Sequence, residues 1–238
     1  MKYIAVIPAR MESKRLPGKP LEKIGSKSMI QRVYEQSMKS KRFEKVIVAT
    51  DSQKIKNHVE SFGEVIMTSS KPLNGTERVS EALNKINISY DYVINIQGDE
   101  PFIKKNQIDT LIDICNGENP ICSLVKKTSY NEELKKNSII KVVMDKEKNA
   151  LYFSRNIIPI YNENAIYYKH IGLYGFKKNV IEKITKLPKS ELEKIESLEQ
   201  LRWLENNYKI KLAITEEDTF GIDTEEDLIK ANKIVLNN

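Results

Sequence analysis

The chain has 238 residues, of which 40% are hydrophobic and 30% charged, and this composition is typical of a globular protein with a substantial core. No apolar run approaches the ~18 residues of a membrane-spanning helix, and the apolar stretch at the N-terminus ends at Pro8, too early for a signal peptide. The formal net charge is +6, but the lysines are scattered rather than gathered in a block, which argues against nucleic-acid binding. We therefore expect a cytoplasmic protein with no membrane and no nucleic-acid partner.

Strands and helices alternate through the first half of the chain. Apolar runs predict strands at 3–8, 45–50, 64–67 and 92–97. Apolar residues at helical spacing predict helices around 30–38, 55–62, 79–86 and 108–115, the third of them capped by Thr76. This alternation predicts an α/β fold: a mostly parallel, Rossmann-like nucleotide-binding sheet with helices on both faces.

The pattern changes near residue 120. Strands are expected at 121–125, 139–144, 151–153 and 170–176 without long helices between them. Alternation resumes with a helix at 193–205, a strand at 209–214 and a helix at 224–236. We expect a single domain over 1–238, with a core of about 1–120 and 176–238 and an inserted, more antiparallel subdomain at about 121–175.

A basic loop follows the first expected strand. Arg10, Arg15 and Lys19 lie within ten residues, and Gly18 lets the backbone approach a ligand closely. A guanidinium group can bind two phosphate oxygens at once, in a bidentate manner. Ligands of open α/β sheets bind beyond the carboxyl ends of the strands, where this loop lies. The loop has neither the Walker A pattern nor G-x-G-x-x-G. It predicts a phosphate site of another kind, with a solvated basic turn as the alternative.

Two aspartates are candidates for a metal site. Asp99 follows the strand expected at 92–97, so it faces the same edge of the sheet as the basic loop. A carboxylate there would repel a phosphate unless a cation lay between them, and Mg²⁺ prefers one or two carboxylates together with substrate phosphates. Thr224 and Asp227 have the spacing of a capping box, which leaves Asp223 beside them without a structural task. A helix or turn cap remains the alternative for both aspartates.

Other polar residues carry weaker signals. Gly75 and Arg78 lie where a polar loop enters a helix, and such a loop could read a base. His170 begins a strand in the expected insertion, where a lone histidine is more often structural than catalytic.

A series of short stretches, taken together, resembles one enzyme family. They occur in the order found in CMP-KDO synthetases, the 3-deoxy-manno-octulosonate cytidylyltransferases, and the resemblance covers nearly the whole chain. The basic loop alone resembles sugar nucleotidyltransferases in general, whereas the later stretches are much more specific. The stretches are 7–10, 15–21, 48–51, 75–78, 97–101, 151–155, 170–174, 196–202 and 221–224.

The resemblance implies a reaction and a set of roles. The anomeric 2-hydroxyl of KDO would attack the α-phosphorus of CTP, forming CMP-KDO for lipopolysaccharide or capsule biosynthesis and releasing pyrophosphate, with Mg²⁺ as cofactor. The family is typically homodimeric, and the inserted region would be the interface. The implied catalytic residues are Arg10, Arg15, Lys19 and Asp99. The implied metal ligands are Asp99 and Asp223. The implied nucleotide-binding residues are Pro8, Ala9, Arg10, Arg15, Lys19, Gly75, Arg78 and Gln97. The implied sugar-binding residues are Gln97, Arg155, His170, Tyr174 and Gln200.

One segment departs from the family pattern. Between Pro159 and His170 the chain is shorter than in many members, and by resemblance this segment lies beside the sugar pocket. A cytidylyltransferase for a related acid, such as 8-amino-KDO or a nonulosonic acid, is therefore the alternative within enzymes. A nucleotide sensor without turnover is the alternative of another class, but such a protein would not need both Asp99 and Asp223.

Overall fold

A computed structural model describes residues 1–13 and 15–236, so Lys14 of the basic loop lies outside the described residues. Its contacts divide the chain into two compact units: unit 1 comprises residues 1–109 and 219–238, and unit 2 comprises residues 110–218. The insertion limits expected from the sequence stay a prediction. In the described part of the chain, every helix is too short or too polar to cross a membrane.

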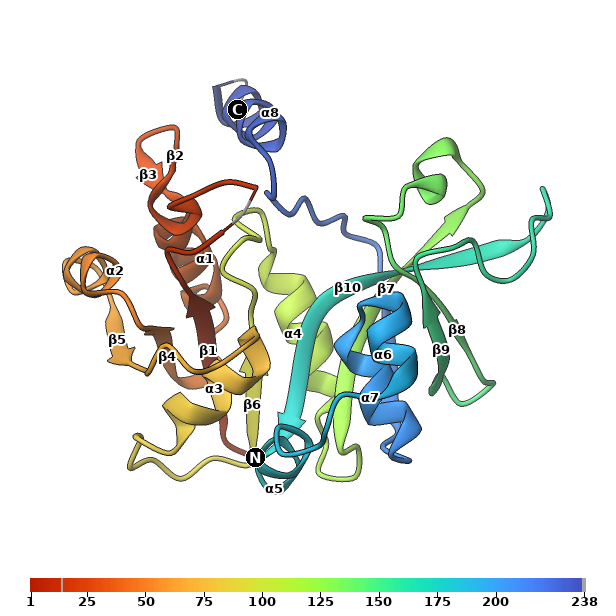
Figure 1. Ribbon diagram of the computed structural model, residues 1–238, viewed down its shortest axis with the longest axis horizontal. Helices are drawn as coiled ribbons and strands as arrows, with labels where there is room; N and C mark the ends of the chain where they lie inside the picture. The colour runs from red at the N-terminus through yellow and green to blue at the C-terminus, as the bar shows by residue number, and fades with distance from the viewer. Residues whose placement is uncertain (14, 237–238) are drawn as a thin grey trace. The chain divides into compact units, whose positions relative to one another are not determined.

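A parallel sheet forms the centre of unit 1. Its strands are β1 (Tyr3–Ala9), β4 (Phe43–Thr50), β5 (Glu64–Met67) and β6 (Tyr92–Asn95), in the order β6-β1-β4-β5 (Figure 1). The chain passes outward from β1 to β4 and β5, then returns to the other side of β1 as β6. The strand order therefore reverses between β1 and β6, which is the point where open α/β sheets bind ligands.

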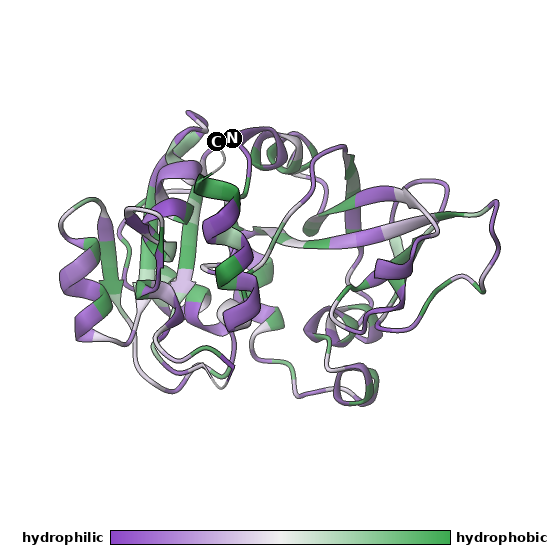
Figure 2. Ribbon diagram, turned by 90° about the horizontal axis from the view of Figure 1, so that it is seen from above, coloured by the Kyte–Doolittle hydropathy of each residue, from purple (hydrophilic) through white to green (hydrophobic). Residues whose placement is uncertain are grey.

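Helices cover this sheet. α1 (Met29–Met38) packs on β1 and β4, α2 (Gln53–Val59) on β4 and β5, and α3 (Gly75–Leu83) on β1, β4 and β6. The strands are largely hydrophobic, and the helices mix hydrophobic and hydrophilic residues, as amphipathic helices on a buried sheet should (Figure 2). This arrangement confirms the predicted α/β class. The remaining elements of unit 1 are η1 (Lys19–Leu21), the hairpin of β2 (Lys23–Ile24) and β3 (Lys27–Ser28), and α8 (Glu225–Leu236), while α4 (Lys105–Ile114) continues into unit 2.

The start of α3 differs from the prediction. Asn74, not Thr76, is its N-cap: the Asn74 side chain accepts a hydrogen bond of 2.8 Å from the backbone N–H of Glu77. Asn74 has the extended backbone of a cap, whereas Thr76 already lies in the first helical turn. Asn and Thr both favour the N-cap, and Asn74, which comes earlier in the chain, occupies it.

Unit 2 is mainly antiparallel. Its strands are β7 (Ile121–Ser129), β8 (Lys141–Met144), β9 (Ala150–Ser154), β10 (Ile166–Lys177) and β11 (Ile210–Thr215). β10 pairs antiparallel with β7 and β8, and β8 pairs antiparallel with β9, whereas β11 pairs parallel with β7. The more antiparallel character expected after residue 120 is confirmed.

The helix expected at 193–205 is wrong as a single element. It is two helices, α6 (Glu191–Glu196) and α7 (Glu199–Glu205), separated by Ser197 in the left-handed conformation with φ 53°. The apolar spacing runs through the break, so periodicity alone could not reveal it. Unit 2 also contains α5 (Lys178–Ile184) and η2 (Glu132–Lys135), which the sequence reading did not include.

Candidate active site

A cavity of about 690 Å³ opens where the strand order of unit 1 reverses. Its walls come from the end of β1, the basic loop, the start of α3, the loop after β6 and the segment before α8. The structure thus brings together, in one cavity, every residue implied for the nucleotide or the metal. They are Pro8, Ala9, Arg10, Arg15, Lys19, Gly75, Arg78, Gln97, Asp99 and Asp223.

The basic loop folds back on itself, and its Arg10, Arg15 and Lys19 line the cavity. Gly18 has φ 72°, a conformation that side chains disfavour, and its N–H donates to the carbonyl of Met11 at 3.1 Å. Leu16 anchors the loop in an apolar cluster with Ile24 and Ile222. Arg10 and Arg15 are exposed and line the cavity, so their guanidinium groups are accessible to an anion.

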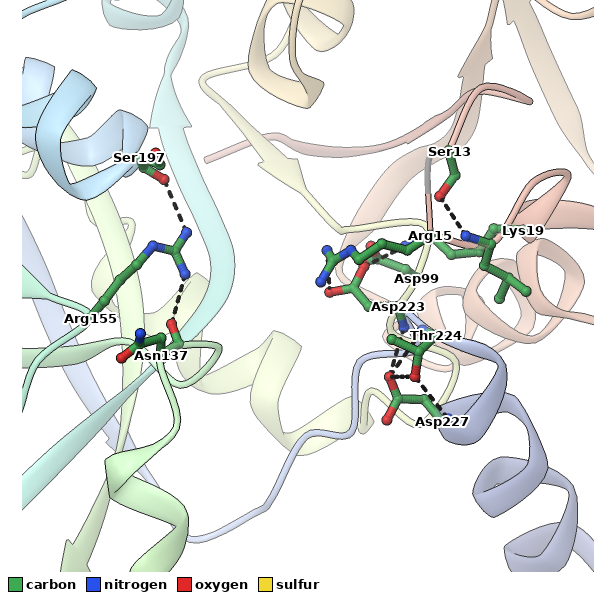
Figure 3. Close-up of polar contacts among 11 residues, drawn as sticks. Ser13, Arg15, Lys19, Asp99, Asn137, Arg155, Ser197, Asp223, Thr224 and Asp227 are labelled. Carbon is green, nitrogen blue, oxygen red and sulfur yellow. Dashed lines mark hydrogen bonds and ion pairs between the residues drawn. The ribbon is translucent and has the colours of Figure 1, made fainter.

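Two carboxylates and two cations meet at one side of the cavity (Figure 3). Lys19 Nζ lies 2.6 Å from Asp99 Oδ2 and 3.0 Å from Asp223 Oδ1, and Arg15 Nη2 lies 2.9 Å from Asp223 Oδ2. Burial disfavours the Lys19 ammonium, but the two carboxylates outweigh it and raise the pKa of Lys19 above its usual value. Lys19 therefore stays charged at neutral pH.

The backbone brings the two aspartates together from distant parts of the chain. The N–H of Ile222 donates to the carbonyl of Asp99 at 2.9 Å, which joins the segment before α8 to the loop after β6. Ile222 is fully buried in the cluster beneath the basic loop. Thr224 and Asp227 form the predicted capping box, with Asp227 Oδ2 accepting from the Thr224 N–H at 3.1 Å and Thr224 Oγ1 accepting from the Asp227 N–H at 3.2 Å (Figure 3). Asp223 is left pointing at Lys19.

The donor set fits magnesium. Asp99 and Asp223 offer carboxylate oxygens that converge on a single ammonium, so a divalent cation could contact both. Among the described residues, no group of three or more His, Cys, Asp or Glu side chains could hold a metal ion. Two carboxylates meet the needs of Mg²⁺, which takes one or two of them and completes its shell with water and substrate phosphates.

Another wall of the cavity is formed where two glycines lie close to Pro8 and Gln97. A Cβ on Gly98 would lie 2.7 Å from the Pro8 carbonyl oxygen, so the loop after β6 can lie against β1 only with glycine there. A Cβ on Gly75 would lie 3.2 Å from Pro8 Cγ and 3.5 Å from Gln97 Oε1. Gln97 Nε2 donates to Asn95 Oδ1 at 3.3 Å. The two glycines leave space beside Pro8 and the polar Gln97, which suits a planar base.

Arg78 lies in this wall but is not a mobile donor. Its side chain is 3% exposed. Nη2 forms an ion pair of 2.8 Å with Asp51 Oδ2, and Nη1 donates to Thr68 Oγ1 at 2.5 Å and to the Ser69 carbonyl at 3.2 Å. Arg78 therefore ties α3 to the ends of β4 and β5 and presents only its remaining N–H groups to the cavity.

Three of the residues implied for the sugar lie in unit 2, where His170 is half-buried and both Tyr174 and Gln200 are buried. His170 Nε2 is 2.9 Å from Ser123 Oγ, and the His170 ring contacts the rings of Phe153 and Tyr174, with ring centroids 5.0 and 5.4 Å away. This enclosure lowers the pKa of His170 to about 3, so its imidazole is neutral at physiological pH. Burial, reinforced by Glu199, raises the pKa of Tyr174, which is 7% exposed. Gln200, on α7, is 5% exposed.

Arg155 is held by backbone carbonyls. Its Nη1 donates to the Asn137 carbonyl at 2.8 Å and its Nη2 to the Ser197 carbonyl at 3.1 Å (Figure 3). Its Nε donates to the Glu196 carbonyl at 2.7 Å. The sequence predicted none of the contacts that hold these side chains: Asp51 and Thr68 with Arg78, Ser123 with His170, and Glu196 with Arg155. Asp51 and Glu196 lie in stretches that carry the family resemblance, but no local pattern predicts these contacts, because each joins residues that are separate in the sequence.

Comparisons with known proteins agree with this geometry. The family model described as cytidylyltransferase matches residues 4–210. The 3-deoxy-manno-octulosonate cytidylyltransferase of Parabacteroides distasonis is 48% identical, covering 100% of this chain and 99% of the relative. The 8-amino-3,8-dideoxy-manno-octulosonate cytidylyltransferase of Shewanella pealeana is 43% identical, covering 96% of each.

A solved structure of a CMP:2-keto-3-deoxy-manno-octonic acid synthetase complexed with CTP superposes with a TM-score of 0.93 at 37% identity, covering 100% of this chain and 99% of the other. The relative from Parabacteroides distasonis and the solved structure therefore match the whole length of the chain, and the family model matches most of it. The chain belongs to the cytidylyltransferase family, in the branch of the 3-deoxy-manno-octulosonate cytidylyltransferases.

Proposed function

We propose that this protein catalyses CTP + KDO → CMP-KDO + pyrophosphate. The anomeric hydroxyl oxygen of KDO forms a bond to the α-phosphorus of CTP and loses its proton to the solvent. The bond from the α-phosphorus to the bridging oxygen breaks, and pyrophosphate leaves with the electron pair. The observation that carries the proposal is the meeting of Arg15, Lys19, Asp99 and Asp223 in the cavity at the strand-order reversal. Both substrates are anionic, so a site that supplies cations and two metal-binding carboxylates meets their needs.

The cavity residues divide the work. Arg10, Arg15 and Lys19 bind the triphosphate and neutralise the negative charge on the departing pyrophosphate. Gly75, Gln97 and the fixed Arg78 hold the base against Pro8 and Ala9. Asp99 and Asp223 hold Mg²⁺, which when bound stabilises phosphate charge and makes the acceptor hydroxyl more acidic. Because such transfers rely on positioning and charge neutralisation, the site needs no dedicated side-chain base.

His170 supports this division. With a pKa of about 3 its imidazole is neutral and weakly basic at physiological pH, so it is suited to orienting an acceptor through hydrogen bonds rather than to removing a proton. Gln97, Arg155, His170, Tyr174 and Gln200 are the proposed acceptor residues. We also place the protein in the cytoplasm, where CTP is made, and propose a homodimer formed through unit 2, on which Leu151, Ile160 and Ile195 are exposed apolar side chains.

Pyrophosphate release tests the proposal. The protein is incubated with Mg²⁺, one of the four common nucleoside triphosphates and one acid from KDO, 8-amino-KDO and a nonulosonic acid. We expect release with CTP and KDO together and none with CTP alone. Turnover with another acid in place of KDO would correct the acceptor, which the Shewanella pealeana relative makes the second candidate. Release without any acceptor, or no release at all, would contradict the proposed transfer.

A further inference from the structure

Lys141, on β8, is a fully buried lysine that the proposed chemistry does not use. Its Nζ donates to the carbonyl of Ile139 at 2.8 Å, to that of Lys136 at 3.4 Å and to that of Arg155. An ammonium has three N–H donors, so each of them meets a backbone carbonyl. Burying such a charge is costly, and burial lowers the pKa of Lys141, against the effect of Glu196. A buried ammonium of this kind indicates that the three carbonyls bound by Lys141 need to be held in place.

Arg155 binds the same loop in return. Its guanidinium donates to the carbonyl of Asn137, between the two loop residues that Lys141 holds. The two cations therefore share their binding partners. Lys141 binds the backbone carbonyl of Arg155, and both side chains bind carbonyls of the loop at 136–139. A shift of the Lys141 side chain would release both the Arg155 backbone and the loop to which the Arg155 guanidinium bonds.

Glu196 holds Arg155 from the opposite side. Glu196 Oε2 accepts from the Arg155 N–H at 2.9 Å, and Glu196 Oε1 accepts from Ser154 Oγ at 2.8 Å. The carbonyl of Arg155 is thus bound by Lys141 and its amide by Glu196. The backbone of this residue is fixed at both ends, while three of the five guanidinium N–H donors are used by carbonyls and two remain for a ligand.

We propose that Lys141 and Glu196 are positioning residues that set Arg155 to bind an anionic group of the acceptor. This inference rests on the proposed function, in which Arg155 belongs to the acceptor site. A planar guanidinium recognises a carboxylate only in the correct plane and direction, so fixing its backbone is worthwhile. Loss of either contact should weaken acceptor recognition and leave the CTP cavity of unit 1 unaffected.

The test measures steady-state kinetics of Lys141→Met, which keeps the length of the side chain and removes its donors. We expect kcat/KM for KDO to fall about tenfold or more, with KM for CTP within about twofold of the wild type. Lys146→Met is the matched control, since Lys146 is exposed in the turn between β8 and β9. Glu196→Gln serves as the second variant, should Lys141→Met not fold, and should act in the same direction.

A double-mutant cycle separates positioning from general stability. If Lys141 and Glu196 act through Arg155, their effects on kcat/KM for KDO disappear in an Arg155→Met background. Additive losses, or equal changes in KM for CTP and for KDO, would overturn the inference. The wild-type enzyme is measured in the same assay, so absence of KDO turnover there would refute the proposed function rather than the role of Lys141.

Discussion

The Nζ atom of Lys19 lies 2.6 Å from Oδ2 of Asp99, and the same ammonium lies 3.0 Å from Oδ1 of Asp223. A lysine suited to binding phosphate is thus paired with the carboxylates suited to binding metal. The ammonium and a divalent cation would compete for the same oxygens. We expect binding of CTP to resolve this competition, because the triphosphate would offer Lys19 another partner. We therefore expect metal to bind well only together with the nucleotide.

Lys19→Met tests this competition without any turnover. Removing a charge about 3 Å from a carboxylate changes its interaction with a cation by ~1 kcal/mol or more, even near the surface. We expect Mn²⁺, followed by electron paramagnetic resonance in the absence of nucleotide, to bind the variant about tenfold more tightly, and CTP to bind about tenfold more weakly. Lys54→Met, at an exposed position on α2, is the control. Unchanged or weaker Mn²⁺ binding by Lys19→Met would refute the competition.

Asp99→Asn removes one of the two carboxylates with little change of shape. We expect the rate of transfer to fall by at least ~100-fold while the urea midpoint and the circular dichroism spectrum stay close to those of the wild type. Glu60→Gln is a suitable control, because Glu60 is a surface carboxylate paired with Lys56 at 2.9 Å. Near-normal activity of Asp99→Asn would show that the metal assignment is wrong.

Gly98→Ala tests the contact between β1 and the loop that carries Asp99. The added methyl would lie 2.7 Å from the Pro8 carbonyl, a backbone atom that cannot rotate away. We expect a loss of about 1–3 kcal/mol in the free energy of unfolding, together with weaker CTP binding. Gly75→Ala should cost less, since its methyl would meet Pro8 Cγ at 3.2 Å. Equal urea midpoints for Gly98→Ala and the wild type would contradict this account of the wall.

The sequence predicted the parallel sheet and the residues that line the cavity. It did not predict the contacts that orient their side chains. Val6 and Ile47, in the apolar runs that form β1 and β4, mark buried strands by local composition alone. Because ligands of open α/β sheets bind beyond the carboxyl ends of the strands, Asp99 was expected beside the basic loop. The structure places both in one cavity. The break at Ser197 was not predictable from periodicity, because a left-handed residue leaves the apolar spacing intact. The ion pair of Arg78 with Asp51 also escaped prediction, since it depends on how β4 meets α3.

His170 gives a prediction about pH. Because enclosure lowers its pKa to about 3, the imidazole stays neutral in the folded protein well below the unfolded value of ~6.5. Between these values the unfolded chain binds more protons than the folded one, so this group removes stability as the pH falls from 6.5 to 3. By proton NMR, the ring signals of His170 should not shift between pH 8 and 5.

The assignment of that signal is simple. The chain has two histidines, so His58→Gln leaves the resonances of His170 alone. His58 is remote from unit 2 in the chain and bonds to Ser28, with Nε2 2.8 Å from Oγ. A titration of the remaining signal with a midpoint near 6.5 would mean that the ring is solvated rather than enclosed.

Phosphorus NMR of a reaction containing CTP, KDO and Mg²⁺ tests the central claim most directly. If Arg15, Lys19, Asp99 and Asp223 form a site for transfer at the α-phosphorus, CTP signals should be replaced by one CMP-sugar diester signal and by pyrophosphate in equal amounts. Both products should be absent when KDO is omitted. Formation of CDP and inorganic phosphate, or unchanged CTP with every acid sugar supplied, would contradict the account.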